Sequence, residues 1–190
     1  MSLRAHSITA IPTRLNGNNF RSRIEARWSI FFNEIGIEFE YEPCPYKLEG
    51  GVWYLPDFWI PYLQSFIEIK GGKPTRQEIW KAKQLAIVTR RPVYIFWGRF
   101  GVPSHQYVRN ATDSAYIYRP YIQRGKIKVV SDNAHWWCEC SYCHTISIQF
   151  EGVTNEICDC FKSHYLYTAE GFSTTRLVMA YLEASRTKFK

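Results

Sequence analysis

Apolar residues recur along the chain with two periods, and these periods predict its elements. Residues 20–36 carry apolar positions at steps of three and four, which predicts a helix with one buried stripe: Phe20, Ile24, Trp28, Phe31, Phe32 and Ile35. We expect Asn18 or Asn19 to cap its start and Gly36 to end it. Residues 75–89 show the same spacing and predict a second helix.

Alternating apolar and polar residues predict strands between and after these helices. The predicted strands cover residues 38–41, 52–54 continuing at 57–60, 65–70 and 93–97. Residues 61–64 form the expected turn before the third strand. The order helix, three strands, helix, strand predicts an α/β core of about 80 residues. The Tyr-rich stretch 101–132 is expected to be looser, and residues 173–190 predict a last helix.

Composition narrows the class of protein. The chain of 190 residues is 46% hydrophobic, enough for a core, so wholesale disorder is excluded. No stretch approaches the roughly 20 apolar residues that span a bilayer, so we expect no membrane partner. The net charge of +7 is local, because residues 71–110 hold eight Lys or Arg against one Glu. A local basic surface indicates a polyanion partner such as nucleic acid, although it also suits a solvated helix face.

Three regions are predicted along the chain. Residues 1–19 are expected to be a flexible N-terminal arm, because Pro12 and the run at 16–19 break any helix. Residues 20–132 hold the α/β domain with an extension, and residues 133–190 hold a cysteine-rich module and the terminal helix. The start of the chain lacks an apolar run with a small-residue cleavage site, so we expect no secretory signal and a reducing, cytoplasmic compartment.

A carboxylate pair and a lysine concentrate the candidate chemistry. Glu68 and Lys70 lie two apart on a predicted strand and therefore share one face. If residues 61–64 form a four-residue turn, Asp57 lies opposite Glu68, with Cβ atoms about 4.5–5.5 Å apart. A divalent cation would neutralise this repulsive pair, and carboxylate oxygens suit Mg²⁺ or Mn²⁺. A surface hairpin with a Glu–Lys ion pair is the alternative reading.

The pattern Pro56-Asp57, ten intervening residues and Glu68-Ile69-Lys70 resembles the PD-(D/E)XK nuclease superfamily. The order of predicted elements resembles the αβββαβ core of that superfamily. The stretches at 20–28, 41–43, 54–58 and 67–71 look like a phage- and plasmid-encoded branch, similar to the endonuclease subunit of some transposition systems and to very-short-patch-repair-like nucleases. The resemblance implies a restriction-endonuclease-like fold and metal-dependent hydrolysis of DNA phosphodiester bonds.

The resemblance also implies roles for single residues. Asp57 and Glu68 would bind Mg²⁺, and Lys70 would orient or help to deprotonate the attacking water. Glu25 matches the helix glutamate that often completes the site of the family, although its spacing equally suits an ordinary partner for Arg21. On the implied fold, basic residues after Lys70 would hold the DNA backbone: Lys73, Arg76, Lys81, Lys83, Arg90 and Arg91.

Cysteine spacing predicts a second metal site. Five of the six cysteines lie between residues 138 and 160, which favours a tetrahedral Zn²⁺ site in a zinc-ribbon-like module. The expected ligands are Cys140, Cys143, Cys158 and Cys160, with Cys138 and His144 as substitutes. A segment this short cannot bury a core alone, so we expect the zinc to staple the fold rather than to bind DNA. Unligated cysteines are the alternative.

Three functions remain open at this point. The first is a Mg²⁺-dependent DNA endonuclease, which predicts metal-dependent cleavage of plasmid DNA. The second is a catalytically silent nucleic-acid-binding protein, which predicts salt-sensitive binding without a metal requirement. The third is a nuclease subunit that is active only within a recombination or transposition complex, with residues 107–121 as the docking surface for its partner. A symmetric double-strand cut would require a homodimer, and nothing in the sequence reports one.

Overall fold

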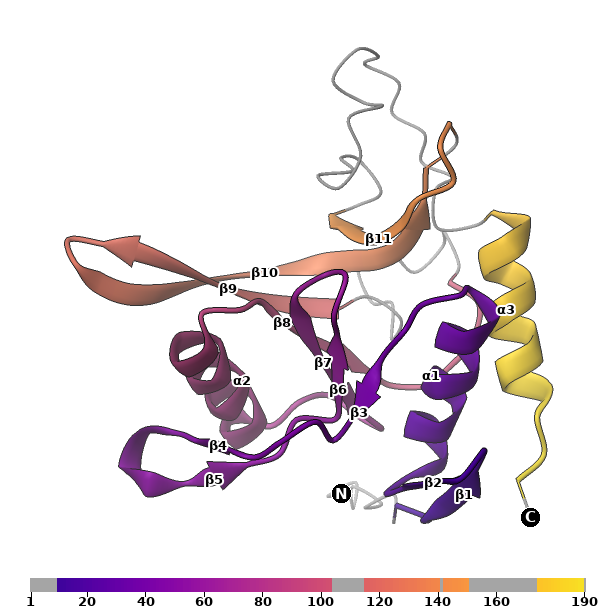
Figure 1. Ribbon diagram of the computed structural model, residues 1–190, viewed down its shortest axis with the longest axis horizontal. Coiled ribbons are helices and arrows are strands. Elements are labelled where there is room, and N and C mark those ends of the chain that lie inside the picture. The colour runs from indigo at the N-terminus through magenta and orange to yellow at the C-terminus, as the bar shows by residue number, and fades with distance from the viewer. Residues whose placement is uncertain (1–9, 104–114, 141, 151–173, 190) are drawn as a thin grey trace, which may run out of the picture.

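The computed structural model describes residues 10–103, 115–140, 142–150 and 174–189, and the structural statements below concern these residues. They form an α/β fold in which helices cover both faces of a seven-stranded mixed sheet (Figure 1). The order of strands across the sheet is β11-β10-β9-β8-β7-β6-β3. The predicted α/β class is therefore confirmed.

The three helices are α1 (Arg23–Glu34), α2 (Arg76–Thr89) and α3 (Thr175–Arg186). The strands of the main sheet are β3 (Glu40–Tyr41), β6 (Phe58–Ile60), β7 (Ser65–Lys70), β8 (Val93–Trp97), β9 (Ala115–Gln123), β10 (Lys126–Glu139) and β11 (Ile146–Phe150). Two small ribbons pair β1 (Thr13–Leu15) with β2 (Asn18–Phe20), and β4 (Tyr46–Lys47) with β5 (Trp53–Tyr54) across the 3₁₀ turn η1 (Glu49–Gly51). None of these helices is long and apolar enough to cross a membrane.

The predicted order of helix, three sheet strands, helix and strand is confirmed, with two local corrections. The second predicted strand is broken, because Pro56 has no N–H for a ladder, so β5 pairs with β4 and only β6 joins the main sheet. The predicted N-cap of α1 is wrong, because Asn18 and Asn19 lie in β2, whereas the helix does end before Gly36 as predicted. Ser22 caps the helix instead, and its hydroxyl accepts a hydrogen bond from the N–H of Glu25 at 3.3 Å.

The β6–β7 hairpin has the predicted register. Residues 61–64 form the turn, and the paired residues are Phe58 with Ile67, Trp59 with Phe66 and Ile60 with Ser65. β7 then pairs in parallel with β8 through the crossover helix α2. The sheet therefore has one parallel pair beside the hairpin that carries the candidate chemistry.

The sheet separates two hydrophobic cores, one on each face. Figure 1 shows α2 on one face and α1 with α3 on the other. Ile67 and Ile69 of β7 belong to the α1 core, while Phe66 packs in the α2 core with Leu85. Alternation along β7 therefore places Glu68 and Lys70 on the α2 face.

The prediction of a looser stretch at 101–132 is wrong for residues 115–132, and residues 104–114 lie outside the described part of the chain. Residues 115–123 and 126–139 form the two longest strands of the sheet, joined by a turn at Arg124 and Gly125 with φ of 51° and 72°. The expected boundary between residues 132 and 133 falls inside β10. β11 and α3 pack in the same core as α1. Of the expected N-terminal arm, residues 13–19 belong to the β1–β2 ribbon, which ends at Phe20, and residues 1–9 lie outside the described part of the chain.

Candidate active site

Two buried carboxylates and a lysine meet at the carboxyl end of β7. The Nζ of Lys70 lies 3.1 Å from Oδ2 of Asp57 and 3.0 Å from Oε2 of Glu68. Asp57 is 4% exposed and Glu68 is 1% exposed. Asp57 directly precedes β6, so the hairpin register carried one step past its last pair places it across from Glu68, as the sequence predicts. The structure thus brings together three of the four predicted catalytic residues.

Asp57 is fixed by two further donors. The backbone N–H of Ile69 donates to its Oδ2 at 2.7 Å, and the guanidinium of Arg21 donates to its Oδ1 at 3.2 Å. Arg21 also forms an ion pair with Glu42. Sequence reasoning missed the contact between Arg21 and Asp57, because no spacing rule links residues 36 positions apart.

The carboxylate of Glu68 is only half satisfied. Its Oε2 accepts hydrogen bonds from the hydroxyl of Tyr54 and from Lys70. Its Oε1 is buried and has no hydrogen-bond partner among the described residues. Burial, and then the negative charge of Asp57, raise the pKa of Glu68 to about 7. The site therefore favours a further proton or cation at this oxygen.

Lys70 is held in its charged form. Burial alone would lower its pKa, but the attraction of Glu68 and Asp57 outweighs burial and raises the pKa above its ordinary value. An amine that keeps its proton cannot act as a base. In this arrangement Lys70 is therefore a fixed positive charge and a hydrogen-bond donor.

Glu25, the fourth predicted residue, lies at the start of α1 with both carboxylate oxygens occupied. Its Oε1 accepts from the hydroxyl of Ser22 at 2.6 Å. Its Oε2 accepts from the hydroxyl of Tyr41 at 2.7 Å and from the backbone N–H of Arg21 at 3.1 Å. Among the described residues, no hydrogen bond joins Glu25 to Asp57. Arg21 connects the two, because its backbone contacts one and its side chain the other.

The predicted DNA-binding residues lie mainly on α2 and in the loop before it. Lys73 and Arg76 are exposed in the preceding loop and the first turn. Lys81 lies over the ring of Tyr54, with Nζ 5.3 Å from the centroid, and Lys83 lies over another tyrosine ring at 5.8 Å. Because the hydroxyl of Tyr54 reaches Glu68, Lys81 is the basic residue of α2 that the structure ties to the site.

The carboxylate pair fits a divalent cation with oxygen ligands. Among the described residues, no group of three or more His, Cys, Asp or Glu side chains is arranged to hold a metal. Mg²⁺ needs only one or two carboxylates, since it keeps water molecules and takes phosphate oxygens from a substrate. Asp57 and Glu68 supply such oxygens, and the Oε1 of Glu68 is a buried acceptor without a donor. The residues present therefore suit Mg²⁺ or Mn²⁺.

The predicted zinc ligands are described only in part. Cys140 and Cys143 flank the turn between β10 and β11, where the N–H of His144 donates to the carbonyl of Cys140. Cys158 and Cys160 lie outside the described residues. Cys138 is buried in β10, and burial raises its pKa to about 12. Because a zinc-bound cysteine is a thiolate, the surroundings of Cys138 do not favour it as a substitute ligand.

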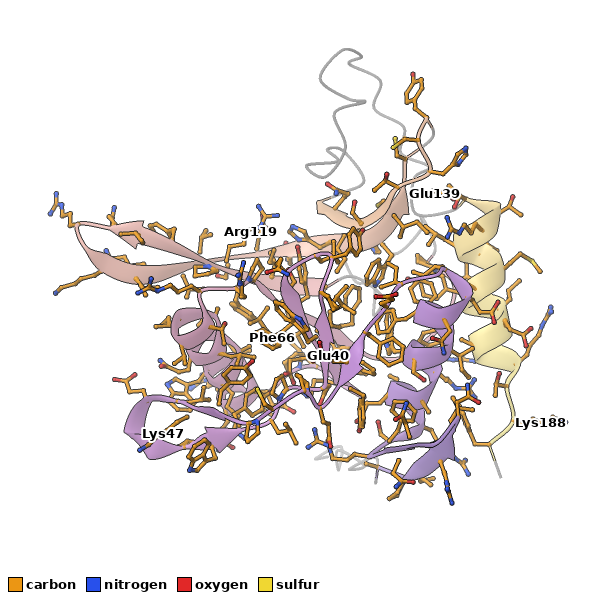
Figure 2. The ribbon with its side chains drawn as sticks, viewed as in Figure 1. Glu40, Lys47, Phe66, Arg119, Glu139 and Lys188 are labelled. Atoms are coloured by element: carbon orange, nitrogen blue, oxygen red, sulfur yellow. The ribbon has the colours of Figure 1, made fainter. Side chains whose placement is uncertain are left out.

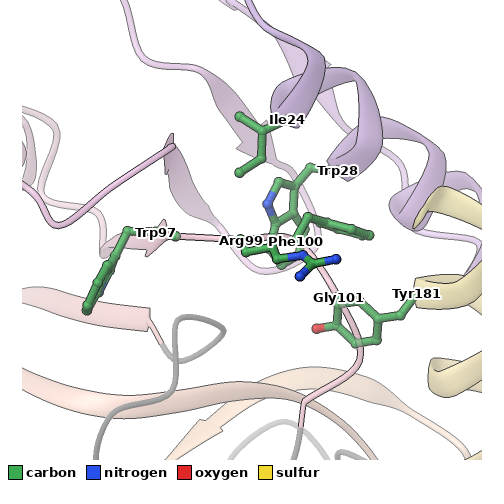
Figure 3. Close-up of a pocket in the computed structure, with 8 residues that line it drawn as sticks. Ile24, Trp28, Trp97, Arg99, Phe100, Gly101 and Tyr181 are labelled. Atoms are coloured by element: carbon green, nitrogen blue, oxygen red, sulfur yellow. The ribbon is translucent and has the colours of Figure 1, made fainter. Parts of the chain in front are cut away.

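A small cavity lies away from the carboxylates. It has a volume of about 10 Å³, room for about one water molecule, and Trp28, Phe100 and Tyr181 line it. Trp97 also touches this cavity, but Figure 3 shows its ring directed away from the others. Trp97 pairs with Lys70 in the β7–β8 register and stacks on Tyr116, with ring centroids 6.0 Å apart. An aromatic pair therefore lies beside Lys70, which sequence reasoning also missed.

Comparisons of the sequence with models of known protein families and with the curated proteins find no match. The functional argument therefore rests on the arrangement of these side chains.

Proposed function

We propose that the protein is a metal-dependent endonuclease that hydrolyses phosphodiester bonds in DNA. The observation that carries this proposal is the contact of Lys70 with two buried carboxylates, one of which keeps an oxygen without a donor. Burying two like charges costs free energy that packing alone does not require. A site for a cation and a phosphate gives these costly groups a function.

The chain's own residues would divide the work. Asp57 and Glu68 would hold Mg²⁺ or Mn²⁺, which supplies Lewis-acid stabilisation of charge on the phosphate. Lys70 keeps its proton and donates hydrogen bonds, so it would orient a water molecule or a phosphate oxygen. Arg21, half-exposed beside Asp57, would contact the phosphate from the solvent side.

Two further features support a restriction-endonuclease-like nuclease. The elements α1, β3, β6, β7, α2 and β8 occur in the order that the resemblance implies, with the β4–β5 ribbon inserted between β3 and β6. The helix α2, which carries most of the predicted basic residues, covers the face of the sheet that carries Glu68. Lys73, Arg76, Lys81 and Lys83 would therefore hold the phosphate backbone beside the cut.

The test is cleavage of supercoiled plasmid DNA with Mg²⁺, Mn²⁺ or EDTA. We expect the parent protein to cut with either metal and not with EDTA. Lys70→Met should lose cleavage, whereas the matched variant Lys188→Met, at an exposed lysine near the end of the chain, should cut like the parent. Circular dichroism and the Tm show whether each variant folds. Equal cleavage by both folded variants would place the activity elsewhere.

A catalytically silent nucleic-acid-binding protein is the second candidate, and one observation favours it. Lys70 and Arg21 already set two positive charges against Asp57 and Glu68, so the site is balanced without a metal. This candidate predicts equal DNA binding in Mg²⁺ and in EDTA. It also predicts that Mg²⁺ leaves the Tm unchanged, whereas an ion bound at Asp57 and Glu68 raises the Tm.

We also propose that one structural Zn²⁺ is held by Cys140, Cys143, Cys158 and Cys160. The first two cysteines lie at one turn, which brings half of the ligand set together. Elemental analysis of the purified protein should find about one zinc per chain. Cys140→Ser should lose it and Cys44→Ser, at an exposed cysteine outside the cluster, should keep it. Zinc retained in Cys140→Ser would contradict the ligand set.

A further inference from the structure

The outer part of the β9–β10 hairpin extends beyond the body of the protein. Figure 1 shows it projecting past α2, and we call residues 116–131 the β-arm. Its inner part is anchored, because Tyr118 is buried in the α2 core and Val129 packs against that core. Its outer residues, including the turn at 124–125, are exposed. The hairpin thus combines a fixed base with a free end.

The β-arm is basic along its whole length. Residues 116–131 contain four Lys or Arg and no Asp or Glu, a net charge of +4. The basic residues are Arg119, Arg124, Lys126 and Lys128. The surrounding segment 111–190 holds nine Lys or Arg against eight Asp or Glu, so its charge as a whole conceals this patch.

The strand register gathers most of these charges on one face. Lys126 pairs with Gln123, Lys128 with Tyr121 and Val130 with Arg119. Paired residues share a face and alternate pairs face the same way, so one face carries the basic strip: Arg119, Tyr121, Lys126, Lys128 and Val130. Figure 2 labels Arg119 on the hairpin. Tyr121 and Val130 are 43% and 53% exposed, which gives the strip apolar area between its charges.

The strip lies on the opposite face of the sheet from Glu68. Ile117, two residues before Arg119 on β9, is buried in the core beneath α1, whereas Glu68 faces α2. The strip is therefore separate from the basic residues of α2. It is a second positive surface that the metal site does not explain.

We propose that the basic strip binds the backbone of duplex DNA, as an anchor outside the metal site. A two-stranded β-ribbon fits the major groove of B-DNA, which is about 12 Å wide. Alternate residues of an antiparallel strand lie about 6.8 Å apart, which matches the rise of two base pairs. The absence of acidic residues from 116–131 matches a polyanion, and Tyr121 and Val130 offer contact to sugars and base edges. This anchor shares its partner with the proposed nuclease but not its chemistry.

The test is binding of a fluorescent DNA duplex of about 30 base pairs to the full chain, in EDTA so that no cleavage occurs. The test variant removes the two exposed lysines of the strip and the adjacent charge at the tip of the turn: Lys126→Gln, Lys128→Gln and Arg124→Asn, where Asn tolerates the positive φ. The matched control removes three exposed charges elsewhere: Arg14→Gln, Arg186→Gln and Lys188→Gln. Anisotropy gives the Kd over a series of salt concentrations, and the Tm checks folding.

Loss of three phosphate contacts should weaken binding about 10²-fold at 0.1 M salt and reduce the slope of log Kd against log salt by about 3. The control variant should stay within about threefold of the parent, since distant charges are screened. If both variants lose the same affinity for DNA, the net charge of the protein explains the effect, and the proposal is wrong. Arm-dependent binding to phosphatidylserine vesicles, with DNA binding unchanged, would overturn it in favour of a membrane.

The anchor and the nuclease fail separately. If the protein never cuts DNA but the arm variant still loses duplex binding, the proposed nuclease is wrong and the anchor stands. If the parent cuts and the arm and control variants bind alike, the anchor is wrong and the nuclease stands.

Discussion

Glu25 and Glu68 are both buried glutamates that accept a hydrogen bond from a tyrosine hydroxyl, yet their surroundings differ. Glu25, at the start of α1, takes donors on both oxygens from Ser22, Tyr41 and the backbone of Arg21. Glu68, in β7, takes donors on one oxygen only. Lys70 is among the donors to Glu68, whereas Glu25 receives its hydrogen bonds from two hydroxyls and an amide.

This difference separates a carboxylate that completes the fold from one that is open to a ligand. The chain itself satisfies Glu25, which then holds the first turn of α1 in place. Glu68 keeps a buried acceptor that only a proton, a water molecule or a cation can complete. Burial therefore does not distinguish the two acids, whereas incomplete hydrogen bonding marks Glu68 as the candidate ligand-binding acid.

The largest expected effect concerns DNA cleavage. Glu68→Gln keeps the shape of the side chain but removes the charge that would bind the metal, so cleavage should fall by at least about 10³-fold. Glu25→Gln should keep cleavage within about tenfold of the parent, because its carboxylate is occupied at the helix start. Rates of plasmid nicking with Mg²⁺ measure both.

A larger loss of cleavage in Glu25→Gln than in Glu68→Gln would reverse the roles given to the two glutamates. If Glu25→Gln lost cleavage while its Tm stayed near that of the parent, Glu25 would be the third acid that the family resemblance implies. If Glu68→Gln cut normally, the unsatisfied oxygen would have no part in catalysis.

The second prediction concerns stability and pH. Because the pKa of Glu68 is raised to about 7, the folded state holds a proton that the unfolded state loses near pH 4.5. Rising pH therefore destabilises the parent across this window, by up to about 3 kcal/mol. Glu68→Gln lacks this loss, so its Tm in EDTA should rise relative to the parent between pH 5 and pH 8. If the difference in Tm between Glu68→Gln and the parent stays constant with pH, the pKa of Glu68 is not raised in the folded protein and this prediction is wrong.

The arrangement of the two carboxylates and the lysine was predictable because these residues are close together in the sequence. Asp57, Glu68 and Lys70 lie within one hairpin, where a turn of four residues sets the register and alternation sets the face. The contacts of Arg21 and Tyr54 were not predictable in this way. They depend on where α1 and the β4–β5 ribbon pack against the sheet, and no periodicity encodes that packing.

The fold was predictable where one face of an element is buried. β7, β8 and α2 follow their patterns closely, because each presents apolar residues to a core. The β-arm was missed because much of its outer part is exposed on both faces, so burial imposes no alternation on residues such as Tyr121 and Ile122. An exposed functional surface leaves a weaker hydrophobic pattern than the core that supports it.

A third prediction addresses the structural side of the comparison. Ser22→Ala removes the cap of α1 and one donor to Glu25, so the free energy of unfolding should fall by about 1–2 kcal/mol. Ser2→Ala, outside the described residues, serves as a composition control. Chemical denaturation measures both variants. No change in Ser22→Ala would mean that the hydrogen bonds between Ser22 and Glu25 do not stabilise the start of α1, and the structural role given to Glu25 would be wrong.

The smallest effect separates the two tyrosines. The hydroxyl of Tyr54 lowers the pKa of Glu68, so Tyr54→Phe should raise that pKa further. A proton then competes better with Mg²⁺, and the midpoint pH of the Mg²⁺-induced rise in Tm should move upward by less than about one unit. Tyr41→Phe removes the matching hydroxyl from Glu25 and should leave this midpoint in place, although it lowers the Tm itself. Equal shifts in both variants would mean that the two carboxylates act as one coupled site, joined through Arg21, and would remove the distinction between them.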